Sequence, residues 1–147
     1  MINELLDVGK IQFGVEADTW ETALRKAGEF LVQDKKITEQ YVENMIEAVK
    51  EKGPYIVIMP GVAFGHARPD ENVLETCLHM IRLKKPVNFG SKYNDPVKVV
   101  FVFACSDDKG HLSVMRNIAK MLVEEDNVDI LLNEADEDRV RKLLNEY

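Results

Sequence analysis

The stretch that most constrains the fold is the apolar run Val97–Ala104. Its residues are almost all β-branched or aromatic, and Lys98 is the single charged residue within it. A strand with one face in water would alternate polar and apolar residues, whereas a nearly continuous run is typical of a strand covered on both faces. We therefore predict a strand at the centre of a sheet, with other elements packed on both of its faces.

Two amphipathic helices are predicted upstream of this strand. Thr19 is a suitable N-cap, and apolar residues follow it at spacings of three and four as far as Leu31. A second start at Thr38 leads into a similar apolar stripe that ends at Gly53 and Pro54, where glycine can cap a helix and proline cannot continue it.

Short apolar runs replace the helical spacing after Pro54, and we predict strands at Tyr55–Met59, Gly61–Phe64 and Thr76–Leu83. A third helix is expected to begin near His111, and the segment 127–147 is expected to form two short helices with a break around Asp136. This order of elements predicts an α/β fold, a single-domain sandwich over residues 1–147 in which helices flank a mixed central β-sheet.

Charge and composition narrow the class of function. The chain of 147 residues carries 26 acidic and 19 basic side chains, a formal charge of -7, which disfavours nucleic acid as a partner. The N-terminal stretch lacks a basic start and an apolar core, and no segment approaches the roughly 20 apolar residues of a membrane span, so we expect a cytoplasmic protein. Cys77 and Cys105 lie in apolar runs without CxxC spacing, so we expect both to be packed thiols.

Two of the three histidines lie at ends of predicted elements. His66 follows a strand, and His111 begins a helix. Reacting groups in α/β folds gather beyond the carboxyl ends of strands, and a helix N-terminus attracts anions. A neutral imidazole can attack phosphorus without a metal or another cofactor, so a phosphate held between His66 and His111 is the chemistry we expect. His79 lies within a strand among apolar neighbours, and we expect it to be a packed or edge residue.

The segment 59–69, MPGVAFGHARP, makes a family resemblance specific. It resembles the active-site segment of the mannitol/fructose class (type 2) of enzyme IIA of the sugar phosphotransferase system. The likeness is greater to the ascorbate-specific subgroup, in which Gly-Pro-Tyr, an apolar strand, Pro-Gly and His-Ala-Arg-Pro follow one another as in residues 53–69. The family's second histidine region resembles Asp107, Gly110, His111 and Leu112.

This resemblance implies a phosphotransferase that carries phosphohistidine. His66 is similar in position to the phosphoryl-accepting nucleophile, and His111 to the histidine that stabilises the phosphate. The implied partners are the phosphocarrier HPr as donor and enzyme IIB as acceptor, with the membrane enzyme IIC served indirectly and ascorbate as the transported compound. No heptad repeat or long exposed apolar face is present, so the sequence leaves the oligomeric state open.

Two positions depart from the family pattern. Gly65 stands where proline is usual before the nucleophile, which removes a restricted backbone angle. Lys50 stands where an arginine is common, and it can supply charge but not the two-pronged grip of a guanidinium on phosphate. From the residues alone, we infer that Arg68 supplies that grip from the other side, so Arg68 and Lys50 are the predicted phosphate-binding residues.

Two further classes of function stay open. One is a regulatory module that is phosphorylated at the same histidine, although the chain has neither the extra length nor the basic face of a fused DNA-binding part. The other is a metal hydrolase that uses His66, His111 and Asp107, although no recognised ligand spacing such as HExxH is present.

Transfer between two proteins also predicts a shallow site with an exposed apolar rim, because the partner must reach the nucleophile directly. Met59, Val62 and Phe64 precede His66 and are the candidates for such a rim.

Overall fold

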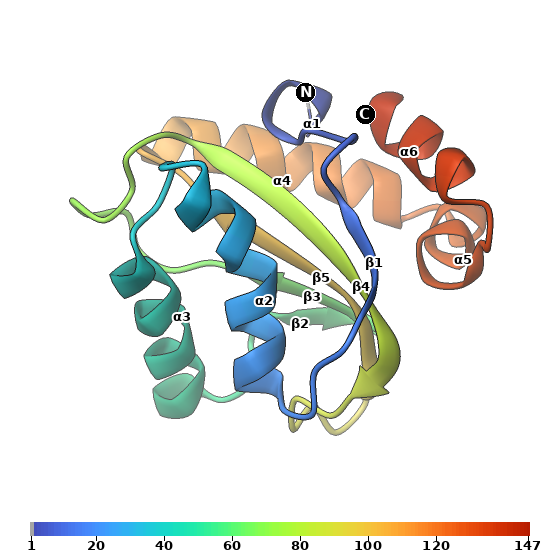
Figure 1. Cartoon of the computed structure of the whole chain (residues 1–147), viewed down its shortest axis with the longest axis horizontal. Coiled ribbons are helices and arrows are strands. Elements are labelled where there is room, and N and C mark those ends of the chain that lie inside the picture. Colours follow the sequence, from blue (N-terminus) through green and yellow to red (C-terminus); the bar gives the residue numbers. More distant parts are fainter. Residues whose placement is uncertain (1) are drawn as a thin grey trace.

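A five-stranded mixed sheet forms the middle layer of the computed structural model, which describes residues 2–147 except for the side chain of Asp108 (Figure 1). Its order is β1-β4-β5-β3-β2. The bounds are β1 Gln12–Val15, β2 Val57–Met59, β3 Val62–Gly65, β4 Cys77–Val87 and β5 Val97–Ala104. β5 runs parallel to β3 and antiparallel to β4, and β1 is parallel to β4. The predicted central strand and the mixed sheet are both confirmed.

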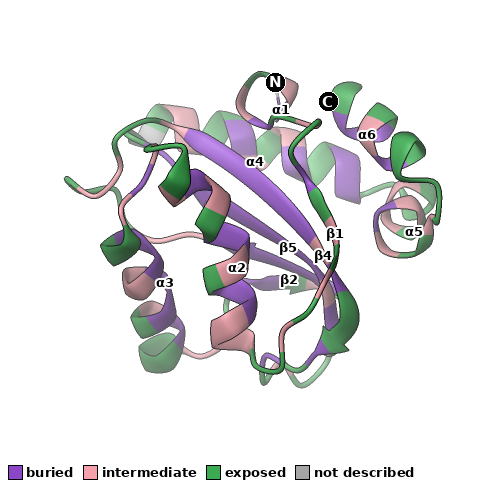
Figure 2. Cartoon of the chain, in the orientation of Figure 1, coloured by how far each residue is buried: buried purple, intermediate pink, exposed green. Residues whose placement is uncertain are grey.

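Helices cover both faces of the sheet (Figure 1). One face carries α2 (Trp20–Gln33) and α3 (Glu39–Lys52), and the other carries α1 (Ile2–Leu5), α4 (Asp108–Leu122), α5 (Glu125–Asn133) and α6 (Glu137–Asn145). Figure 2 shows β5 and most of β4 buried, with an exposed stretch towards the end of β4. Within β5, Val100, Val102 and Ala104 pack towards α2 and α3, while Val99, Phe101 and Phe103 pack towards the opposite helices. The continuous apolar run is therefore explained by burial on both faces.

The structure shows the capping interactions predicted at the ends of α2 and α3. The side chain of Thr19 accepts a hydrogen bond from the Thr22 N–H at 3.2 Å, and Thr38 accepts one from the Tyr41 N–H at 3.3 Å. Gly53 ends α3 at a φ of 84°, a conformation that favours glycine. The two short C-terminal helices are also confirmed, with α6 beginning immediately after Asp136.

The structure corrects some details of these predictions. α4 begins at Asp108 and not at His111, because the carboxylate of Asp107 accepts the Gly110 N–H at 2.7 Å and caps the helix. α1 and β1 were not predicted, since each has only four residues and β1 lies at an edge of the sheet with its residues exposed or half-buried.

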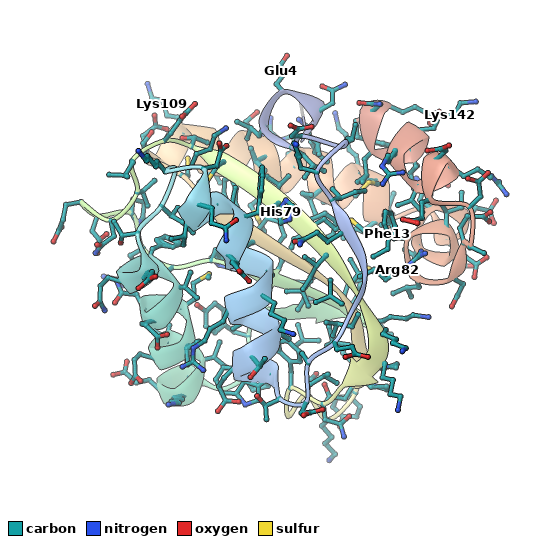
Figure 3. All side chains as sticks on the ribbon, viewed as in Figure 1. Glu4, Phe13, His79, Arg82, Lys109 and Lys142 are labelled. Carbon is teal, nitrogen blue, oxygen red and sulfur yellow. The ribbon has the colours of Figure 1, made fainter. Side chains whose placement is uncertain are left out.

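An arginine on β4 connects the C-terminal helices to the sheet through hydrogen bonds. The guanidinium of Arg82 donates to the carbonyl oxygens of Leu131 at 3.2 Å and Glu134 at 2.7 Å, at the end of α5. It also lies 4.7 Å from the ring centre of Phe13, and Figure 3 shows both side chains between β1 and the C-terminal helices. Arg141 of α6 contacts the same ring at 5.3 Å. Phe13 therefore joins two arginines that come from different layers.

The Arg82→Met variant should lose about 2 kcal/mol of unfolding free energy, because carbonyl groups at the end of α5 lose charge-assisted hydrogen bonds. Urea unfolding measures this loss. Arg139→Met is the matched control, since Arg139 pairs with Glu134 at 3.1 Å on the surface and exposed pairs contribute little. Equal losses in the two variants would contradict the role assigned to Arg82.

His79 is fully buried in β4, as expected of a packed residue. Its Nε2 hydrogen-bonds Gln12 Oε1 at 3.2 Å, its ring lies 4.8 Å from that of Phe30, and its Nδ1 has no protein partner. Burial lowers the pKa of His79 to about 4, well below the ordinary value of 6.5.

This lowered pKa predicts acid sensitivity. Between pH 6.5 and 4 the unfolded chain binds a proton at His79 and the folded chain does not, so stability falls as the pH falls through that window. His79 should contribute a loss of about 2 kcal/mol between pH 7 and pH 5. Urea unfolding of wild type and His79→Leu at both pH values measures this contribution of His79, because the two proteins share all other titrating groups. The same pH dependence in both proteins would refute the prediction.

Candidate functional site

The parallel pairing of β3 with β5 places the two candidate histidines together. In this pairing Gly65 lies opposite Val102, so the carboxyl ends of both strands reach the same edge of the sheet. His66 follows β3 directly, and the chain beyond β5 leads into the first turn of α4, which carries His111. The two imidazole rings are perpendicular, with centroids 5.7 Å apart.

Two buried phenylalanines pack against these rings from the core side. Phe64 and Phe103 contact each other at 5.6 Å between ring centroids. Phe64 lies 5.8 Å from the ring of His66, and Phe103 lies 5.5 Å from the ring of His111. Since both phenylalanines are fully packed in the core, the histidines rest on a rigid surface.

The hydrogen bonding of His66 defines its tautomer. Its Nδ1 lies 2.8 Å from the carbonyl oxygen of Phe64, and a carbonyl oxygen only accepts, so Nδ1 carries the proton. The lone pair is then on Nε2. Burial is the largest effect on the pKa of His66 and lowers it below its ordinary value. The hydrogen bond to the Phe64 carbonyl raises the pKa by less than burial lowers it, and the neighbouring His111 lowers it further. The lowered pKa favours the neutral imidazole at neutral pH, with its lone pair on Nε2.

The hydroxyl of Tyr41 on α3 ties the segment after His66 to the end of β5. It accepts the N–H of Ala67 at 3.0 Å and donates to the carbonyl oxygen of Phe103 at 2.8 Å. Tyr41 is buried, and burial raises the pKa of its hydroxyl well above the ordinary value, so the donor proton is retained. One side chain thus connects the residue after one histidine to the strand that supports the other.

Gly65 suits the packing around it. It lies within β3, and a Cβ atom there would come within 3.0 Å of Leu24 Cδ2 and 3.3 Å of the carbonyl oxygen of Phe101. Strand pairing and close packing hold the backbone at this position without the restricted angle of a proline.

A cavity of about 680 Å³ opens beside His66 and includes His111 and Arg68 in its lining. Lys50 is not among the lining residues, and its ammonium lies 3.6 Å from the carboxylate of Glu47. Lys52 lines the cavity instead. The structure therefore brings together three of the four predicted site residues and adds Lys52.

Helical spacing is the signal that could have identified Lys52. The α3 residues in the cavity lining are Asn44, Glu47, Ala48, Glu51 and Lys52, which recur at spacings of three and four and so share one face of the helix. Lys50 falls outside that stripe.

The apolar rim predicted from the sequence is wrong for two of its three residues. Val62 and Phe64 are fully buried, because β5 and the α4 side of the core cover them, and Met59 is half-buried. Exposed apolar surface near the histidines comes from Leu112, which is 66% exposed next to His111, and from Tyr55, which is 39% exposed and lines the cavity.

Asp107 takes the role of a helix cap, with its Oδ1 bound to the Gly110 N–H. Among the residues that the structure describes, no three His, Cys, Asp or Glu side chains are grouped as metal ligands. Over the same residues, no helix has both the length and the apolar character needed to cross a membrane.

The fold agrees with comparisons to known proteins. Residues 4–147 match the family described as phosphoenolpyruvate-dependent sugar phosphotransferase system, EIIA 2. The chain belongs to this family and is an enzyme IIA component, a phosphotransferase, so the recognition made from the segment around His66 is confirmed.

Ascorbate-specific enzyme IIA components are among the proteins similar to this chain. The chain is 33% identical over 130 residues to the ascorbate-specific PTS system EIIA components of Escherichia coli (strain K12) and Shigella boydii serotype 4. These matches cover 88% of this chain and 84% of each relative.

A solved complex of enzyme IIA-mannitol and phosphorylated enzyme IIB-mannitol from Escherichia coli contains a chain with a TM-score of 0.84 and 26% identity. That match covers 97% of this chain and 100% of the other. The predicted α/β sandwich is confirmed by this likeness.

The Tyr41→Phe variant should lose about 1–3 kcal/mol of unfolding free energy, because the Ala67 N–H and the Phe103 carbonyl both lose a buried partner while the ring remains. Urea unfolding measures the loss. Tyr93→Phe is the control, since Tyr93 is 82% exposed. Identical unfolding midpoints for wild type and Tyr41→Phe would show that the hydroxyl does not stabilise this junction.

Proposed function

We propose that the chain accepts a phosphoryl group from phospho-HPr on His66 and passes it to enzyme IIB. The observation that carries this proposal is His66 itself, beside a cavity that it shares with a second histidine. Its Nδ1 is engaged by a backbone carbonyl, its Nε2 has no hydrogen bond to the described side chains, and its lowered pKa favours the neutral ring. Membership of the EIIA family supports it.

The chemistry is a pair of displacements at phosphorus. The lone pair of His66 Nε2 attacks the phosphorus of the donor phosphohistidine, a new N–P bond forms, and the donor's N–P bond breaks with its electron pair returning to the donor imidazole. Nδ1 keeps its proton throughout. In the second displacement, a cysteine or histidine of enzyme IIB attacks the phosphorus, and the electron pair of the Nε2–P bond returns to His66.

The other cavity residues supply charge and hydrogen bonds to the transferred group. His111 lies against His66 and in the first turn of α4, so it is placed to stabilise a phosphate on Nε2. Arg68 and Lys52 line the same cavity and bring positive charge to it. The role of Lys50 as a phosphate ligand stays a prediction, and Lys50 is not among the residues that line the cavity.

Relatives of the chain support a transported compound and an acceptor protein. The ascorbate-specific components that the chain resembles support ascorbate as the transported compound, delivered through the membrane enzyme IIC. The likeness to a chain of the complex with phosphorylated enzyme IIB supports enzyme IIB as the acceptor. The proposed relay supports a cytoplasmic location, with residues 1–147 acting as one EIIA domain.

His66→Ala should abolish phosphorylation, because it removes the imidazole beside this cavity whose Nδ1 is held by a backbone carbonyl and whose lone pair is therefore on Nε2. The test incubates wild type and variant with phosphoenolpyruvate, enzyme I and HPr, and detects one acid-labile phosphoryl group by intact-mass spectrometry. Purified enzyme IIB is then added, because onward transfer separates a relay from a purely regulatory module. Uptake by His66→Ala equal to that of wild type would refute the proposal.

In the same assay, His111→Ala should be phosphorylated on the order of 10–100-fold more slowly, since one group that stabilises the transferred phosphate is lost and the nucleophile remains. An unchanged rate would remove His111 from the site.

A further inference from the structure

Tyr55 makes two separate contacts with His66. It follows Gly53 and Pro54, which end α3, and it lines the same cavity as the histidine. Its hydroxyl donates to the backbone carbonyl oxygen of His66 at 3.0 Å. Its ring is perpendicular to the imidazole, with an interplanar angle of 89° and centroids 5.5 Å apart.

These contacts restrain the nucleophile where its own hydrogen bond does not. The bond from Nδ1 to the Phe64 carbonyl fixes the tautomer but is a single attachment, about which the ring can still tilt. Rings of Tyr55 and His111 both lie perpendicular to the imidazole at 5.5 and 5.7 Å, and Phe64 lies at 5.8 Å. The hydroxyl of Tyr55 also holds the backbone of His66, just after β3 has ended.

We propose that Tyr55 is a positioning residue for phosphoryl transfer, which holds the ring and the backbone of His66 so that Nε2 is presented in one orientation. This inference rests on the proposed function of His66. Orientation matters because attack at phosphorus requires the nucleophilic nitrogen in line with the bond that breaks, and a displacement of about 1 Å can slow a reaction on the order of 100-fold.

The same ring keeps water from part of the imidazole. Burial is the largest cause of the lowered pKa of His66, and Tyr55 contributes to that burial. The charged and titratable groups that share the cavity are His111 on α4, Lys52, Glu47 and Glu51 on α3, and Arg68 and Asp70 in the loop after His66. Removing the Tyr55 ring leaves them in place, so the pKa of His66 should rise towards its ordinary value.

The experiment compares Tyr55→Leu and Tyr55→Phe with wild type. The rate of phosphoryl uptake from phospho-HPr is measured at saturating and limiting donor, and the His66 ring is titrated by NMR. Tyr55→Leu should slow uptake on the order of 10–100-fold at saturating donor and raise the pKa of His66. Tyr55→Phe keeps the ring contact and loses only the hydroxyl, so it should slow uptake several-fold and leave the pKa nearly unchanged.

Tyr93→Leu is the matched control. Like Tyr55, Tyr93 is an exposed tyrosine with a lysine near its ring. Lys92 lies 5.4 Å from the ring centre of Tyr93, and Lys52 lies 6.0 Å from the ring centre of Tyr55. Its neighbour Asn94 accepts the Gly61 N–H at the opposite end of β3 from His66. Tyr93→Leu should therefore match wild type in both measurements.

Wild-type uptake rates and wild-type titration of His66 in both Tyr55 variants would overturn the inference. A rate loss only at limiting donor would also overturn it, because it would assign Tyr55 to donor binding. Wild type that takes up no phosphate would refute the proposed relay, and the NMR titration would still decide whether Tyr55 holds the ring of His66.

Discussion

The parallel pairing of β3 with β5 is the constraint on which the site depends. Four residues of β3 pair in register with β5, from Val62 with Val99 to Gly65 with Val102. Because parallel strands end at the same edge of a sheet, the residue after β3 and the helix after β5 must meet there. His66 and His111 are 45 positions apart in the sequence, and this backbone register brings their rings into contact.

The same core that stabilises the sheet also sets the chemistry of His66. Phe64 and Phe103 are part of the packed face under α4, and they form the surface on which both histidines rest. Partial burial lowers the pKa of His66 and favours the neutral ring, and the bond of Nδ1 to a carbonyl leaves the lone pair on Nε2. His79 shows what complete burial does to the same side chain, since its lowered pKa also favours the neutral ring but its side chain does not reach the surface. The two histidines thus differ in exposure, since only His66 borders a cavity.

α3 contributes to the site through two of its faces. Its core face carries Tyr41, whose hydroxyl joins the segment after His66 to the end of β5. Its neighbouring face borders the cavity and carries Lys52. The chain is acidic overall, with a charge of -7, and Lys52 and Arg68 bring positive charge locally to this region.

Local sequence patterns were sufficient for the central strand Val97–Ala104, for the helices that begin after Thr19 and Thr38, and for the position of His66 at a strand end, because apolar periodicity and capping act over a few neighbouring residues. The motif around His66 was sufficient for the family. Only the tertiary structure decided that Lys52 lines the cavity, that Val62 and Phe64 are buried, and that Tyr55 contacts His66. These facts depend on which segments pair and pack across the fold, and no short stretch of sequence carries that information.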